Sequence, residues 1–181
     1  MSWRSTRTEF GSLAIFLHWL MVLLIVAVYA TMEFKSLSQK GSALREAMAT
    51  CHFVLGLTIF ALAWLRLFVR WAGSVPAIEP PPAPWDALLA KAAHFALYAF
   101  MVTMPLLGWL TLSAQGQSVP FFGFELPPLA PKSENLARQF KQLHVSIATF
   151  GYFLIALHAV TALFHHYVKR DNAMIIMSPR R

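Results

Sequence analysis

Four long stretches without a charged side chain constrain this chain more than any other feature. Asp, Glu, Lys and Arg are absent between Glu9 and Glu33, between Glu46 and Arg66, between Lys91 and Glu125, and between Lys141 and Lys169. Since a helix needs about 20 apolar residues to cross a bilayer, each stretch can hold one membrane span. The third is too long for one helix, and residues 113–120 form its polar exit. We therefore predict an all-α bundle of four transmembrane helices at about 11–32, 47–69, 88–112 and 142–168, in one membrane domain over residues 1–181.

The composition excludes several other classes of protein. Hydrophobic residues make up 57% of the chain and charged residues 13%, whereas soluble domains have about 45–50% and about 25%. A soluble enzyme and a disordered chain are therefore both excluded. The net charge of +7 does not indicate nucleic-acid binding, which needs a basic face on a soluble core. The single cysteine, Cys51, excludes an internal disulfide and any multi-cysteine metal site.

The first span has some features of a signal peptide, because residues 27–30 loosely resemble a cleavage site. Its apolar run is longer than a usual signal core, and it contains His18 and Trp19. We predict that this span is retained as a membrane helix.

The distribution of Lys and Arg predicts that both termini are cytoplasmic. One side carries nine such residues: Arg4, Arg7, Arg66, Arg70, Lys91, Lys169, Arg170, Arg180 and Arg181. The other side carries six: Lys35, Lys40, Arg45, Lys132, Arg138 and Lys141. The long outer loop, residues 113–141, is too apolar for a free linker, so we expect it to fold over the outer mouth of the bundle.

Histidines inside the spans are the main candidates for function, since ionisable residues are rare there. The chain has seven: His18, His52, His94, His144, His158, His165 and His166. His144 and His158 are fourteen residues apart and share one helix face, about 21 Å apart along the axis. Gly151 lies midway on that face, where a missing side chain lets a bulky flat group approach the backbone. A single buried histidine can instead be a hydrogen-bonded packing residue.

The predicted depths of these histidines form two level pairs. His18 and His158 fall in the inner half of the bundle, and His52 and His144 in the outer half. Facing neutral imidazoles can supply both axial ligands of a haem iron. Zinc is the competing metal, but it needs four ligands clustered at one depth. His94 lies near the inner start of the third span and remains an alternative to His18.

The order of these histidines and their neighbours resembles one known family. The matching elements are His18-Trp19, Met32-Glu33-Phe34, His52, His94 with Tyr98, Pro105 with Gly108, His144, Gly151-Tyr152, His158, and the run from His165-His166-Tyr167 to Lys169-Arg170-Asp171-Asn172. Along nearly its whole length the chain resembles the bacterial cytochrome b561 family, which are four-helix, di-haem b proteins of the inner membrane. The resemblance implies that two haems b bind, with His18 and His158 ligating the inner iron and His52 and His144 the outer iron. Gly151 is then expected to pack against haem.

Within the family, the likeness is greatest to members that act as superoxide oxidases. These take electrons from superoxide on the periplasmic side and pass them to ubiquinone. Candidates for quinone or haem-propionate contacts on the inner side are His94, His165, His166 and Arg66. For His165 and His166, a place among the lipid headgroups is an equal alternative.

The basic outer face fits an anionic electron donor. Lys35, Lys40, Arg45, Lys132, Arg138 and Lys141 can steer superoxide to the outer haem. Arg45 and Lys141 are expected nearest that haem, with Lys35 and Lys40 further away on the loop. These side chains can instead contact solvent, lipid phosphates or haem propionates.

Two other functions compete with a self-contained oxidoreductase. One is a cytochrome b subunit that transfers electrons for a dehydrogenase or another respiratory complex; the short termini and moderate outer loop provide little surface for such a partner. The other is a transporter, which the spans disfavour because they contain no Asp or Glu to couple ions.

Overall fold

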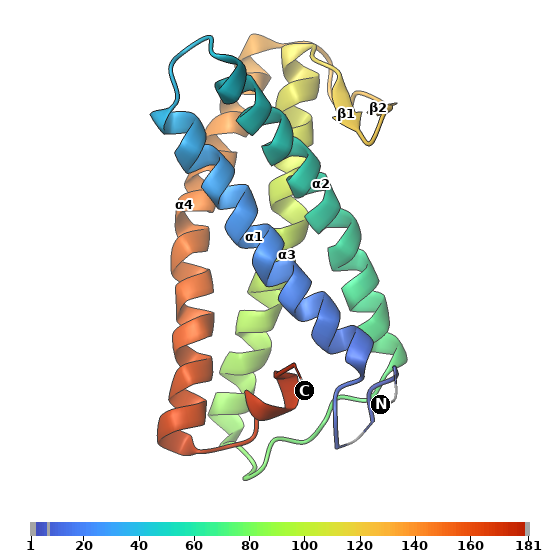
Figure 1. Ribbon diagram of the computed structural model, residues 1–181, viewed down its shortest axis with the longest axis vertical. Helices are drawn as coiled ribbons and strands as arrows, with labels where there is room; N and C mark the ends of the chain where they lie inside the picture. The colour runs from blue at the N-terminus through green and yellow to red at the C-terminus, as the bar shows by residue number, and fades with distance from the viewer. Residues whose placement is uncertain (1–2, 7, 180–181) are drawn as a thin grey trace.

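The computed structural model of the protein describes residues 3–6 and 8–179, so Arg7, Arg180 and Arg181, which were counted above, lie outside the described residues. Four long helices account for most of the chain: α1 (Ser12–Leu37), α2 (Ala43–Ala72), α3 (Pro84–Gln115) and α4 (Glu134–Phe164). Each is long and apolar enough to cross a membrane. The predicted all-α architecture of four spanning helices is confirmed (Figure 1).

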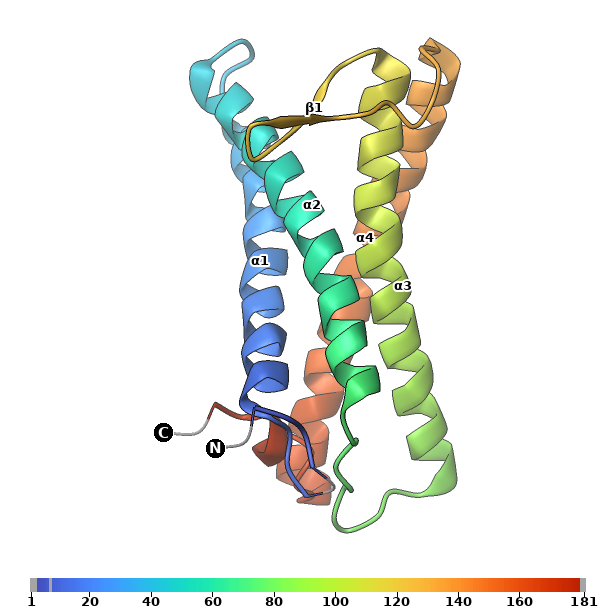
Figure 2. The same ribbon diagram turned by 90° about the vertical axis from the view of Figure 1, so that its right-hand side faces the viewer.

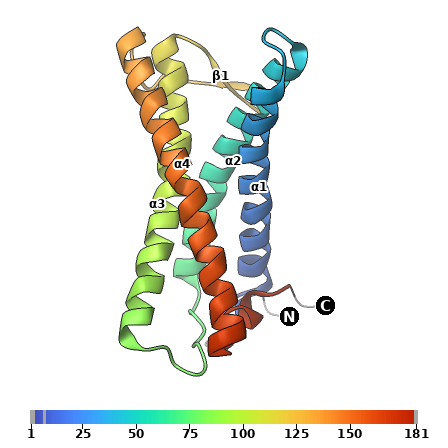
Figure 3. The ribbon, with the colours of Figure 1, turned by 90° about the vertical axis from the view of Figure 1, so that its left-hand side faces the viewer.

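The helices form two antiparallel hairpins that stand side by side. α1 packs along α2 and α3 packs along α4, whereas the two hairpins touch each other mainly through α2 and α3. Figures 2 and 3 show the two pairs from opposite sides. Both termini and the loop at 73–83 lie at one end of the bundle, here called the termini side. The loop at 38–42 and a short β-hairpin lie at the other end, the hairpin side (Figure 1).

Local sequence signals set the helix ends. Ser42 caps α2 by accepting a hydrogen bond from the Arg45 backbone, and Ser133 caps α4 in the same way. α3 begins with Pro84 in its first turn and ends at Gly116, whose φ of 72° favours glycine. α4 continues into a π-turn (His165–Lys169), and a 3₁₀ turn (Ile175–Met177) follows.

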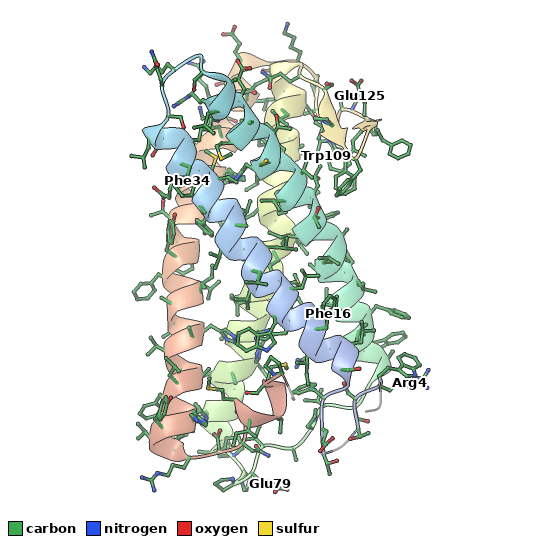
Figure 4. The ribbon with its side chains drawn as sticks, in the orientation of Figure 1. Arg4, Phe16, Phe34, Glu79, Trp109 and Glu125 are labelled. Atoms are coloured by element: carbon green, nitrogen blue, oxygen red, sulfur yellow. The ribbon has the colours of Figure 1, made fainter. Side chains whose placement is uncertain are left out.

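Buried apolar side chains fill the bundle at two depths. Halfway along the helices, Met21, Ile59, Ala63 and Met101 form a cluster contributed by α1, α2 and α3. Many other apolar side chains face outward, such as Phe95 at 77% exposure, as expected for helices that contact lipid. Labelled charged residues lie at the two ends, Arg4 and Glu79 on the termini side and Glu125 on the hairpin side (Figure 4).

The outer loop is folded against the bundle, as its apolar sequence suggested. Its strands β1 (Val119–Phe121) and β2 (Phe124–Leu126) pair antiparallel. Val119 is buried against Leu57 of α2 and Leu112 of α3. The Trp109 indole donates a hydrogen bond to the Pro127 carbonyl at 3.0 Å, beside the β-hairpin (Figure 4).

The turn between α1 and α2 is held by Arg45. Its guanidinium Nη1 donates to the Lys35 carbonyl at 2.8 Å and to the Ser38 carbonyl at 3.1 Å. The Lys35 carbonyl also accepts from the Ser38 backbone N–H at 3.2 Å. Arg45 adds a second donor there and links the end of α1 to the carbonyl of Ser38, which lies beyond the last helical turn. This side chain therefore has a structural role at the hairpin side.

Replacing Arg45 by Ala should lower the thermal unfolding midpoint, because hydrogen bonds from a charged donor each contribute about 1.5–3 kcal/mol. Circular dichroism of the detergent-solubilised protein would measure the shift. Lys40→Ala, an exposed change in the same turn, is the matched control. Equal midpoints for the two variants would contradict the structural role.

Candidate functional site

Four histidines face one another in two pairs that bridge the helical hairpins. On the hairpin side, the ring centroids of His52 (α2) and His144 (α4) are 6.1 Å apart, with an interplanar angle of 68°. On the termini side, the centroids of His18 (α1) and His158 (α4) are 6.5 Å apart, at 73°. The structure thus brings together both pairs that the sequence suggested, each across the space between the hairpins.

The spacing of both pairs fits an iron between the rings. A bond from a metal to an imidazole nitrogen is about 2.0–2.1 Å long, so a metal in line between two facing rings puts their centroids about 6.3 Å apart. Both pairs lie close to this separation. His94 is nearer to His158, at 5.5 Å, which is shorter than that arrangement needs. Geometry therefore favours His18 over His94 as the partner of His158.

A tetrahedral zinc site does not fit this arrangement. Within residues 3–6 and 8–179, no group of three or more His, Cys, Asp or Glu side chains is placed to hold a metal ion. Two ligands at each of two depths suit a planar cofactor that supplies the remaining ligands itself.

His52 is oriented by the helix it packs against. Its Nδ1 lies 3.1 Å from the Val28 carbonyl and 3.3 Å from the Thr31 hydroxyl, and that hydroxyl donates to the same carbonyl at 2.6 Å. Because a carbonyl can only accept, Nδ1 carries the proton and Nε2 keeps its lone pair. A metal-ligating histidine is held in this way when its other nitrogen donates to a carbonyl.

His144 is held by packing. Its Nδ1 is buried and has no hydrogen-bond partner among residues 3–6 and 8–179. A Cβ on Gly108 of α3 would lie 3.7 Å from the Cε1 atom of His144, so the glycine lets the ring approach α3 closely. A buried imidazole without a partner is costly, and a bond from its second nitrogen to a metal would offset that cost.

A cavity of about 290 Å³ adjoins both rings of the hairpin-side pair. All four helices line it, largely with apolar side chains, and Gly56 and Gly108 are among the lining residues. A Cβ on Gly56 would meet nothing within 4 Å, so the bare backbone of α2 borders open space there. A flat, mostly apolar group with an iron at its centre fits this cavity and this donor set.

Gly151 lies against two aromatic side chains of other helices. The space that its missing side chain leaves is filled by the Tyr29 hydroxyl and by the Phe100 ring, whose nearest carbons are 2.5 Å from the position of a Cβ. Gly151 does not line the cavity beside His52 and His144. Two aromatic side chains from α1 and α3 occupy that position in this structure, and the packing of a cofactor on Gly151 stays a prediction.

Arg66 and His94 accompany the termini-side pair. The Arg66 Nε donates to the Tyr98 hydroxyl at 3.1 Å. The Arg66 charge is close enough to act on both His18 and His158. Of the expected inner-side contacts, Arg66 and His94 thus lie beside the pair.

His165 and His166 belong to the C-terminal turn below the pair. The His165 Nδ1 is 2.5 Å from the buried Asp171 carboxylate, which engages this side chain. The His166 Nδ1 is buried and has no partner. The segment is anchored by an ion pair between Lys169 and Asp86 and by a 2.9 Å hydrogen bond from the Trp19 indole to the Met177 carbonyl.

The six basic residues of the hairpin side fall into separate groups. Lys35 lies in the last turn of α1, half-buried, and its charge interacts with those of Arg45 and Lys141 and with His52. The expectation that Lys35 is remote on the loop is therefore wrong, because α1 continues to Leu37. Lys132 and Arg138 line a separate pocket of about 350 Å³ at the α3–α4 end. Lys40 is exposed in the turn.

Sequence reasoning missed Thr31 and Gly56. Gly56 follows His52 by one helical turn on the same face, and this spacing could have identified it. Thr31 gave no comparable signal, because its contact with His52 depends on how α1 packs on α2.

The chain is similar in sequence to several known proteins. Residues 9–179 match the family described as prokaryotic cytochrome b561. The chain is 37% identical over 173 residues to cytochrome b561 homolog 1 of Escherichia coli K12, covering 96% of this chain and 98% of that protein. It is 31% identical over 173 residues to the probable superoxide oxidase CybB of Yersinia pestis, covering 96% and 97%. It is 25% identical over 176 residues to cytochrome b561 homolog 2 of Escherichia coli K12, covering 96% and 93%.

Proposed function

Because the chain belongs to the prokaryotic cytochrome b561 family, which are haem b electron-transfer proteins of the membrane, we propose that it binds two haems b and acts as a superoxide:ubiquinone oxidoreductase. Superoxide is oxidised at the periplasmic face, and ubiquinone is reduced nearer the cytoplasmic face of the bacterial inner membrane. The hairpin side is periplasmic, and both termini are cytoplasmic.

One observation carries the proposal: two facing histidine pairs at different depths, with centroid separations of 6.1 and 6.5 Å. A single pair would serve a one-haem protein at one face. Two pairs, about 21 Å apart along α4, give a route for electrons across much of the hydrocarbon core, which is about 30 Å thick. The similarity to a probable superoxide oxidase supports the choice of donor.

Each pair of histidines is assigned to one haem. His52 and His144 would hold one haem, and His18 and His158 the other; each bound haem supplies a centre that accepts and releases one electron. Two superoxide ions give up one electron each and leave as dioxygen. Ubiquinone takes up these two electrons and two protons to become the quinol.

Charged side chains support both half-reactions. Lys35 lies on the hairpin side near His52, and Lys141 lies near Lys35. Together these two charges attract a small anion. On the termini side, we expect the Arg66 guanidinium to donate a hydrogen bond to a quinone carbonyl, with His94 beside it. His165 is a weaker candidate for that role because Asp171 already engages it.

Single replacements of the histidines should remove the haems selectively. His144→Ala is expected to lose chiefly the hairpin-side haem and His158→Ala chiefly the termini-side haem. His18→Ala should lose the termini-side haem, whereas His94→Ala should retain it. Haem per chain, measured as the pyridine haemochrome, and the reduced b-type spectrum test this. Full haem content in both His144→Ala and His158→Ala would refute the ligand assignment.

Reversing a charge near His52 should slow the encounter with superoxide. Lys141→Glu is expected to reduce the rate of haem reduction by superoxide about tenfold, with haem content intact, since a positive rim speeds association with anions. The wild-type rate should also fall as ionic strength rises. Stopped-flow absorbance is the measurement.

Arg138→Glu is the matched control for Lys141→Glu, because Arg138 lies in the separate pocket at the α3–α4 end. A rate that is indifferent to salt and equal in the two variants would argue against superoxide as donor. It would favour the alternative of an electron-transfer subunit that receives electrons from a protein partner.

Replacing Arg66 by Gln should impair the quinone half-reaction. Ubiquinone reduction is expected to slow severalfold, while haem reduction by superoxide stays at the wild-type rate, because the Arg66 charge acts at His18 and His158 and not at the hairpin side. Lys91→Gln, an exposed change on the same side, is the control. A quinone-head inhibitor that protects residues of the hairpin side alone would refute this placement.

A further inference from the structure

Two aromatic side chains meet α4 at the level between the histidine pairs. Gly151 is buried and lies seven residues from both His144 and His158. Tyr29 reaches it from α1, and its hydroxyl donates to the Ala148 carbonyl at 2.7 Å. Phe100 reaches it from α3. These three residues, Tyr29, Phe100 and Gly151, are here called the partition.

The partition is tightly packed. An added Cβ on Gly151 would lie 2.5 Å from two carbons of the Phe100 ring, a separation that requires the ring to move. Phe100 also packs on the central cluster that contains Met21 and Met101. Glycine at this position therefore allows both rings to close the space between α4 and the other helices.

The same two rings border the hairpin-side cavity. Tyr29 and Phe100 both line it beside His52 and His144. Both rings also contact the position of Gly151, which is not among the residues that line this cavity, and Phe100 packs on the central cluster as well. The partition therefore lies between the levels of the two histidine pairs.

We propose that the partition is the medium through which an electron passes between the two haem sites; this rests on the proposed function, since it requires both haems. Electron tunnelling through protein weakens steeply wherever atoms are not in contact, so closely packed rings transmit it better than a void. One electron would leave the haem held by His52 and His144, which would be oxidised, and would reduce the haem held by His18 and His158. No bond forms or breaks and no proton moves. Gly151 acts as a positioning residue for the two rings.

The single cysteine provides a way to start the electron at one site. Cys51 is exposed and immediately precedes His52. A ruthenium photoreductant attached to Cys51 of the full-length protein would deliver an electron to the hairpin-side haem after a flash. Transient absorbance would then follow its transfer to the termini-side haem.

Phe100→Leu should slow this transfer severalfold in protein that contains two haems. Because Phe100 also lines the hairpin-side cavity, both midpoint potentials are measured in the same variant, and the slowing should exceed what any change in these potentials accounts for. The matched control is Phe95→Leu on the same helix, where the side chain is 77% exposed and the rate should not change. If Phe100→Leu binds less haem, Tyr29→Leu is measured under the same criteria. Gly151→Ala should slow transfer as well, because its Cβ displaces the rings.

Two outcomes would overturn the inference in different ways. Equal transfer rates in Phe100→Leu, Tyr29→Leu and Phe95→Leu, in proteins that contain two haems, would show that the partition is not the medium while leaving the proposed function intact. A wild-type protein with fewer than two haems per chain would refute the proposed function itself, together with the partition that depends on it.

Discussion

The packing of imidazoles across the space between two helical hairpins is the constraint on which the rest of this structure depends. A histidine within a bilayer is costly unless it is neutral and has partners. His52 satisfies this through Val28 and Thr31 of α1, whereas the Nδ1 of His144 is buried without a partner. The two hairpins touch mainly through α2 and α3. A metal bound by one histidine of α1 or α2 and one of α4 would therefore add a link between the hairpins away from that contact.

The two levels are separated by apolar packing and differ in their polar surroundings. The central cluster around Met21 and Met101 keeps water from the region between the pairs. On the hairpin side of this cluster, the basic residue Lys35 interacts electrostatically with His52. Below it, Arg66 and His94 lie beside His158. The bundle therefore presents different chemistry at its two ends, although its helices are similar in length and hydropathy.

The sequence alone predicted the four spans and both histidine pairs, because the absence of charge and the fourteen-residue spacing on α4 are properties of single helices. Features that depend on how helices meet were not accessible in this way. Lys35 was placed on a loop because the end of α1 was set too early. The contacts of Gly151 with Tyr29 and Phe100 could not be foreseen, because the sequence does not tell which side chains of α1 and α3 reach it. The choice between His18 and His94 likewise required the ring separations of 6.5 and 5.5 Å.

The third histidine of the termini side has a rationale in the proposed reaction. Oxidation of superoxide moves one electron and no proton, so the hairpin side needs only a ligand pair and an attractive field for an anion. Reduction of a quinone consumes two protons as well as two electrons, so the opposite side needs groups that can carry a proton or a hydrogen bond beside the ligand pair. His94, with Arg66 and Tyr98 next to it, supplies such groups at the level of His158. Under the proposed function, the 5.5 Å between the rings of His94 and His158 is the distance of a neighbour of the ligand and not of a second ligand.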